Sequence, residues 1–132
     1  MIKKVLVVIL VLILTTPVYA DADRNEFIKN MTNLAGAIKV TKMFCKASNG
    51  VDDEFRRLAG NYGGYLDKQQ HLMTDSEIKL LGDLYKKAQK YWAGIIFSDV
   101  RTEEGVVGIN DAVCRTEVGN IKILLRSYES QY

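Results

Sequence analysis

Residues 74–98 read TDSEIKLLGDLYKKAQKYWAGIIFS, and this stretch predicts one long amphipathic helix. Thr74 and Glu77 are spaced as a capping box, in which each side chain bonds the backbone N–H of the other residue. The apolar residues then recur at intervals of three and four, so that they share one face of a helix: Ile78, Leu81, Tyr85, Ala88, Trp92 and Ile95. The helix is expected to begin after Thr74 and to end near Ser98.

A helix over residues 23–48 is predicted from the same periodicity. Its apolar face is formed by Phe27, Met31, Leu34, Ile38, Thr41 and Cys45. Asp21 or Asp23 can cap its first turn, because a short side-chain oxygen there can accept a free backbone N–H. Asn49-Gly50 is expected to stop the helix, since glycine readily takes the left-handed conformation that follows a last turn.

A helix over residues 53–72 is the least regular of the predicted set. Asp52 or Asp53 can cap its start, and its inner face is formed by Phe55, Leu58, Ala59, Tyr62, Leu66, Gln69 and Met73. Each glycine inside a helix costs about 1 kcal/mol relative to alanine, and this helix contains Gly60, Gly63 and Gly64. The glycines indicate a break near Asn61, a close approach by another helix, or a ligand pocket.

A last helix is predicted at about 107–129, with an apolar face of Val107, Cys114, Val118, Ile121, Leu125 and Tyr128. Asn110-Asp111 interrupts this pattern, so a start at Asp111 is the alternative. The preceding segment 99–105, DVRTEEG, is a polar connection or an irregular helix start. No run of β-branched residues after the first 20 is long enough to predict a strand, and no proline follows Pro17 to interrupt a helix.

The two cysteines indicate how these helices are arranged. Cys45 lies near the end of the first predicted helix and Cys114 near the start of the last, each on its apolar face. In an up-and-down bundle those two ends lie together, so the Cα atoms can reach the separation of ~5.5–6 Å that a disulfide prefers. Such a bridge would stabilise the fold by roughly 4 kcal/mol. We therefore predict an all-α, up-and-down four-helix bundle with one disulfide linking helix 1 to helix 4.

Residues 1–20, MIKKVLVVILVLILTTPVYA, have the pattern of a cleaved secretory signal. Lys3 and Lys4 form a positive start, an uninterrupted apolar run follows, and small residues precede a cut after Ala20. The alternative is a membrane anchor, but the apolar run is about half of the ~20 residues that a span needs. We predict one helical domain over 21–132 and a periplasmic or secreted location.

The charge balance argues against nucleic acid as a partner. The chain has 18 Lys+Arg and 16 Asp+Glu. Lys3 and Lys4 would leave with the signal, so the mature chain would carry no net charge. No basic stripe with interleaved aromatic residues is present. We expect no nucleic-acid binding, and no stable membrane anchor after signal cleavage.

No catalytic, cofactor or metal motif is evident in the sequence. His71 is the only histidine, whereas zinc needs three or four protein ligands. A reactive or metal-binding thiol pair is the alternative to the disulfide, but no C-x-x-C motif or neighbouring histidine supports it. The acidic groups at 52–54 and 103–104 lie near predicted helix starts, where they complement the helix dipole. We expect neither an enzyme nor a bound cofactor or metal.

Aromatic residues and one polar segment are the candidate partner-binding features. Tyr91 and Phe97 fall off the main apolar face, and Tyr65 flanks the glycines. Exposed aromatic side chains are frequent in binding hot spots. The polar segment 99–105 would suit an inhibitor loop through its charged side chains, Asp99, Arg101, Glu103 and Glu104.

These features favour a small exported protein–protein interaction module. Its format of signal, helical fold and disulfide is similar to that of small immunity proteins that counter amidase effectors of type VI secretion. We expect an inhibitor or immunity-type protein that binds an envelope or effector protein. The alternatives are an accessory subunit of a secretion or conjugation system, and a small-ligand carrier with an inter-helix pocket near Gly60–Gly64.

Overall fold

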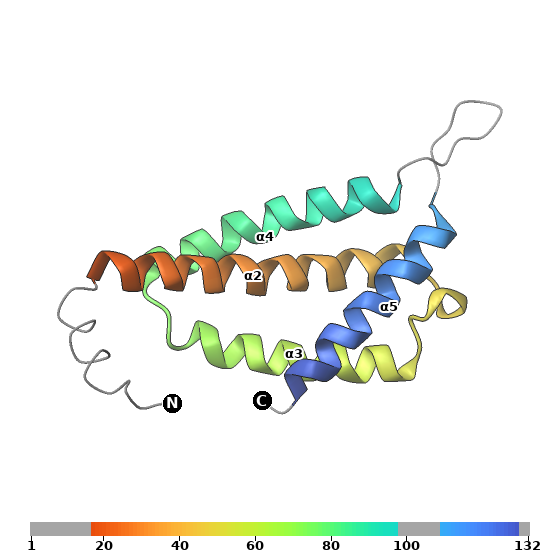
Figure 1. Ribbon diagram of the computed structural model, residues 1–132, viewed down its shortest axis with the longest axis horizontal. Coiled ribbons are helices and arrows are strands. Elements are labelled where there is room, and N and C mark those ends of the chain that lie inside the picture. The colour runs from red at the N-terminus through yellow and green to blue at the C-terminus, as the bar shows by residue number, and fades with distance from the viewer. Residues whose placement is uncertain (1–16, 98–108, 130–132) are drawn as a thin grey trace, which may run out of the picture.

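A computed structural model describes residues 17–97 and 109–129 of the chain (Figure 1). Within these residues the chain forms helices and no strand, which confirms the predicted all-α class. The elements in chain order are α2 (Pro17–Phe44), the short 3-10 helix η1 (Ala47–Asn49), α3 (Asp53–Gln70), α4 (Asp75–Ile96) and α5 (Asp111–Tyr128).

The four α-helices of the described residues run alternately in opposite directions and form two layers (Figure 1). α2 and α4 lie side by side and run the same way, and α2 makes its most extensive contacts with α4. α3 and α5 pack against this pair, and α5 crosses both α2 and α3 obliquely (Figure 1). The predicted up-and-down four-helix bundle is confirmed, with the parallel helices α2 and α4 in the closest contact.

α2 is buried on two faces, which places it at the centre of the bundle. The face predicted from the sequence packs into the core between the layers, with Met31, Leu34, Ile38, Thr41 and Cys45 all buried. A second buried face repeats every four residues and consists of Ile28, Thr32, Gly36 and Val40. The hydroxyl of Thr32 donates to the carbonyl of Ile28 at 2.8 Å, so its burial leaves no unpaired polar atom.

The parallel helices α2 and α4 touch at a glycine. A Cβ at Gly36 would lie 2.5 Å from the Cβ of Ala88 and 3.1 Å from the carbonyl carbon of Ala88. These distances are too short for real contacts, so only glycine permits this separation of the two backbones.

The predicted roles of the α3 glycines as a break or a helix contact are wrong. A Cβ at Gly60, Gly63 or Gly64 would meet nothing within 4 Å, so no helix approaches closely there. α3 also continues without a break past Asn61 to Gln70. The close approach lies instead at Gly36, on the second buried face of α2, which was not predicted.

The remaining core comes mainly from α3 and α5. Its buried side chains on these two helices are Phe55, Leu58, Ala59, Tyr62, Cys114, Val118, Ile121 and Leu125. The hydroxyl of Tyr62 donates to the carbonyl of Met31 at 3.1 Å, which joins α3 to α2. In α4, by contrast, only Ala88 and Ile96 are buried. Most of the predicted apolar face of α4 is therefore only partly covered.

Three of the helix starts have side-chain caps. Asp52, one of the two predicted candidates, accepts the backbone N–H of Phe55 at 2.9 Å. The capping box of Thr74 and Glu77 is confirmed, with its two hydrogen bonds at 3.1 and 3.2 Å. α5 begins at Asp111, the alternative start, because Asn110 accepts a backbone N–H of the first turn at 3.1 Å. The predicted start at Val107 lies outside the described residues.

The bounds of α2 differ from the prediction at both ends. The helix begins at Pro17, whose fixed φ suits a first helical residue, so neither Asp21 nor Asp23 caps it. It also ends before the predicted Ser48, and η1 follows. Gly50 then takes a φ of +104°, the left-handed conformation predicted for it.

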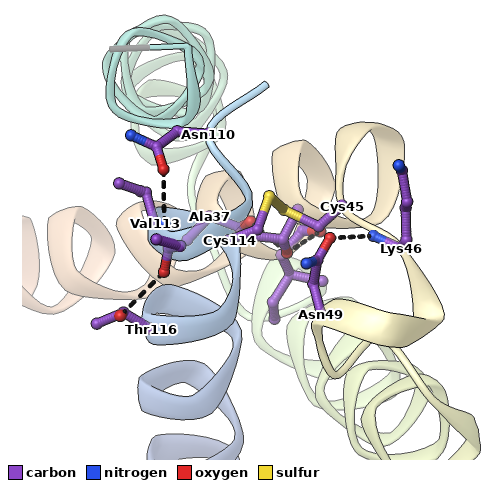
Figure 2. Close-up of a disulfide and its surroundings, with 11 residues drawn as sticks. Ala37, Cys45, Lys46, Asn49, Asn110, Val113, Cys114 and Thr116 are labelled. Carbon is purple, nitrogen blue, oxygen red and sulfur yellow. Dashed lines mark hydrogen bonds between the residues drawn. A yellow bond between two sulfur atoms is a disulfide. The ribbon is translucent and has the colours of Figure 1, made fainter. Parts of the chain in front are cut away.

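The predicted disulfide joins Cys45 to Cys114, with the two Cα atoms 5.7 Å apart. Figure 2 shows Cys45 just beyond the end of α2 and Cys114 in the first turn of α5. Both cysteines are buried. The side chain of Asn49, also buried, accepts the backbone N–H of Lys46 at 3.0 Å and so holds the turn beside the bridge (Figure 2).

The predicted signal at 1–20 lies mostly outside the described residues. Its last four residues form the first turn of α2, so cleavage after Ala20 would leave a helix that starts at Asp21. None of the described helices is long and apolar enough to cross a membrane. The disulfide is compatible with an oxidising compartment, and the signal and the periplasmic location stay predictions.

Candidate functional site

A cleft between α2, α4 and α5 is flanked by exposed aromatic and apolar side chains. Its volume is about 240 Å³, and the residues that line it include Asn33, Trp92, Glu117, Asn120, Leu124 and Tyr128. Leu124 on α5, which lines the cleft, is 47% exposed. Tyr91 on α4 is 62% exposed and lines a neighbouring hollow that shares Asn33 with the cleft. We name this region the Tyr91–Leu124 surface and define it as Asn33, Tyr91, Trp92, Asn120 and Leu124.

The two aromatic rings of this surface are held by contacts within the α2–α4 layer. The indole Nε1 of Trp92 donates to Oδ1 of Asn33 at 3.2 Å. The ring of Tyr91 stands edge-on to the indole, with 5.6 Å between the ring centroids, which is a favourable geometry for an aromatic pair. Both rings are therefore presented by packed helices and not by a loop.

The three predicted partner-binding aromatics lie in different settings. Tyr91 is the exposed one, as expected for a residue off the main apolar face. Phe97 follows the end of α4 and is half-buried, with its ring edge-on to Phe44 at a centroid distance of 4.9 Å. Tyr65 is also half-buried, and its ring lies 5.9 Å from that of Tyr62. Whether these residues bind a partner stays a prediction.

The charged part of the predicted partner-binding set cannot be placed. Asp99, Arg101, Glu103 and Glu104 all lie outside the described residues. Of the predicted partner-binding set, the structure therefore places the three aromatic residues, Tyr65, Tyr91 and Phe97.

Sequence reasoning missed the exposure of Leu124 and the partial exposure of Trp92. Ile123, Leu124 and Leu125 are three consecutive apolar residues on one helix, and they cannot all face the same side. Leu125 is fully buried while Leu124 is not. The run of three apolar residues therefore indicated that some of them would be exposed. Trp92 was assigned to the core face of its helix, and it does pack against the core, but it is only half-buried and also lines the cleft.

A groove between α2 and α3 lies where the carrier hypothesis placed a pocket. Its volume is about 370 Å³, and Gly63 is one of the residues that line it. The other lining residues are mostly apolar, with Lys39 and Lys42 on the α2 side and the ring of Tyr85 from α4. A groove is therefore present beside Gly63, one of the glycines near which a pocket was predicted.

Ion pairs join α5 to the start of α3. The ammonium of Lys122 lies 2.9 Å from Oδ2 of Asp52, and Arg126 donates two hydrogen bonds to Glu54, at 2.6 and 3.0 Å. The hydrogen bond from Lys122 lowers the pKa of Asp52, and the backbone N–H of Phe55 lowers it further. The hydrogen bond from Arg126 lowers the pKa of Glu54. These acids therefore hold two helices together, besides complementing the start of α3.

Acid is expected to weaken this connection between α3 and α5. Because the folded-state pKa values of Asp52 and Glu54 are lowered, their stabilising effect is complete above the unfolded values of about 3.9 and 4.3. It is lost as the pH falls through the lower, folded-state values. Urea unfolding at about pH 6 and about pH 3 measures the difference. Stability should fall less in a Lys122→Gln/Arg126→Gln variant, and an equal fall in both proteins would contradict the prediction.

The acidic and histidine residues of the described part form no evident reactive cluster. His71 is exposed, and its ring Nδ1 lies 2.7 Å from the carbonyl oxygen of Asp67. Among the described residues, no group of three or more His, Cys, Asp or Glu side chains is placed to hold a metal ion. The features that stand out are therefore the Tyr91–Leu124 surface and the α2–α3 groove.

Comparisons with known proteins identified no relative of this chain. No protein-family model, curated protein or solved structure matches the chain. Its function has to be inferred from the surfaces that the fold presents.

Proposed function

We propose that this chain is an exported helical protein that binds another protein through the Tyr91–Leu124 surface. The observation that carries the proposal is the exposure of Tyr91 and Leu124 beside a cleft that Trp92 lines. Tyrosine and tryptophan are among the residues most enriched in interface hot spots. A partner that covered this surface would remove both aromatic rings and the leucine from water.

The composition of the cleft supports a protein partner. Apolar and aromatic side chains occupy it together with the polar groups of Asn33, Glu117 and Asn120. Interfaces commonly have an apolar centre with a polar rim. At about 240 Å³ the cleft is smaller than the roughly 300–1,000 Å³ usual for small-molecule sites. It therefore suits one anchoring side chain of a partner.

The inhibitor or immunity-type role remains the preferred form of this proposal. Tight inhibition favours a surface that is already ordered before binding, because ordering side chains costs affinity. The packed helices and the bridge between Cys45 and Cys114 support such order near the surface. An accessory subunit of a secretion or conjugation system would use the same surface within a larger assembly.

Photo-crosslinking from position 91 tests the proposal directly. A photoreactive amino acid replaces Tyr91 in the oxidised, exported protein, which is then irradiated in an envelope extract of its own host. We expect one dominant cross-linked protein, because a specific surface excludes other neighbours. Mass spectrometry of that product identifies the partner. An enzyme or toxin indicates an inhibitor, and a component of an envelope machine indicates an accessory subunit.

A matched control uses another exposed apolar residue. Leu72, between α3 and α4, is 74% exposed, so a photoreactive residue there reports non-specific contact. The same cross-link from positions 72 and 91, or none from 91, would contradict the proposal. An untagged competitor carrying Tyr91→Ala/Leu124→Ala should fail to suppress the cross-link, whereas the wild-type competitor should suppress it.

A further inference from the structure

We propose that the groove between α2 and α3 binds a single-chain anionic amphiphile, namely a medium-chain fatty acid. The groove has a volume of about 370 Å³, which lies within the roughly 300–1,000 Å³ usual for small-molecule sites. It shares no residue with the Tyr91–Leu124 surface. The inference is therefore independent of the protein partner.

The walls of the groove are suited to a hydrocarbon chain. α2 contributes Ala35, Ile38 and Met43, and α3 contributes Ala59, Gly63 and Leu66. The segment from Ala35 to Met43 extends about 12 Å at 1.5 Å per residue, so the groove is elongated. Met43 is 60% exposed, and covering it with hydrocarbon removes apolar surface from water.

Positive charge along the groove selects the headgroup. Lys39 and Lys42 line the groove and are exposed, and no acidic side chain lines it. Within the described residues neither lysine has a carboxylate partner, whereas Lys122 is paired with two acids. Apolar walls beside two uncompensated ammonium groups match an acyl chain that ends in a carboxylate. A neutral chain would gain nothing from the lysines.

Gly63 keeps the groove open. A Cβ at Gly63 would meet nothing within 4 Å, so a larger side chain there would extend into the groove without a clash. A Cβ at Gly60 would also meet nothing within 4 Å, but Gly60 does not line this groove. The helix thus provides a blocking variant, Gly63→Leu, and a matched control, Gly60→Leu, with the same change in helix propensity.

Calorimetric titration of the oxidised, exported protein with laurate tests the proposal. We expect the wild-type protein and Gly60→Leu to bind laurate alike. Gly63→Leu should bind it at least about tenfold more weakly, because the leucine occupies the space of the chain. Lys39→Gln/Lys42→Gln should weaken laurate binding by about fivefold, since each exposed ion pair contributes little. Circular dichroism confirms that each variant is folded.

Lauryl alcohol, which has the same chain and no charge, is the ligand control. It should bind the wild-type protein more weakly than laurate, and the lysine substitutions should leave its affinity unchanged. No binding of laurate by the wild-type protein would overturn the proposal, as would equal binding by Gly63→Leu and Gly60→Leu. Equal affinity for laurate and lauryl alcohol would overturn the assigned headgroup. Cross-linking from position 91 tests the protein-binding surface separately.

Discussion

Replacing Cys45 and Cys114 together by alanine is expected to lower the free energy of unfolding by about 4 kcal/mol. The bridge joins residues 69 positions apart, so it strongly restricts the unfolded chain, and its loss restores that entropy. The effect is large, because domains of this kind are stable by only about 5–15 kcal/mol. Urea unfolding of the oxidised wild-type protein and of the double variant measures the difference.

Reduction of the wild-type protein gives the control for this prediction. A reductant should lower the unfolding midpoint of the wild-type protein toward that of the double variant and leave the variant itself unaffected. Alanine is preferred to serine because both sites are buried, where an unpaired hydroxyl would add a cost of its own. A wild-type midpoint that does not respond to the reductant would show that the bridge is not formed in solution.

Replacing Gly36 by valine is expected to lower the free energy of unfolding by about 2–3 kcal/mol. The new Cβ would lie 2.5 Å from the Cβ of Ala88 and 3.2 Å from the backbone nitrogen of Gln89, so α2 and α4 must separate. Gly82→Val on α4 is the matched control, because a Cβ there meets nothing within 4 Å. Thermal and urea unfolding of the two variants should differ clearly, with Gly82→Val close to the wild-type protein.

A double-mutant cycle identifies the contact itself. Ala88→Gly alone should destabilise the protein, because glycine is a poor helix former. In a Gly36→Ala background, Ala88→Gly should lower the free energy of unfolding by less. The reason is that it removes the Cβ atom that the new alanine at position 36 would meet. Substitutions of residues in contact show coupling of this kind, whereas the effects of substituting distant residues on stability are additive. Additive effects would contradict the close approach of α2 and α4.

The candidate surfaces were only partly predictable. Tyr91 could be placed off the apolar face of its helix, because side-chain direction follows from a helical period of 3.6 residues. The exposure of Leu124 and Trp92 could not be predicted, because it depends on where α5 crosses α2 and α4. The pocket suspected near Gly60–Gly64 came from composition, but the lysines that give the groove its charge are on α2.

The sequence by itself determined the helices, most of their ends and the disulfide. These depend on local contacts: hydrogen bonds four residues apart, caps such as Thr74 and Asn110, and two cysteines at adjoining helix ends. Only the tertiary structure decided that α2 and α4 are the closest pair, because this rests on Gly36 meeting Ala88 across 52 positions of sequence. The order of the helices permits several packings of one helix on another, and side-chain shape at such distant contacts selects among them. The same packing leaves the side chains of Tyr91 and Leu124 exposed to water and forms the groove beside Gly63.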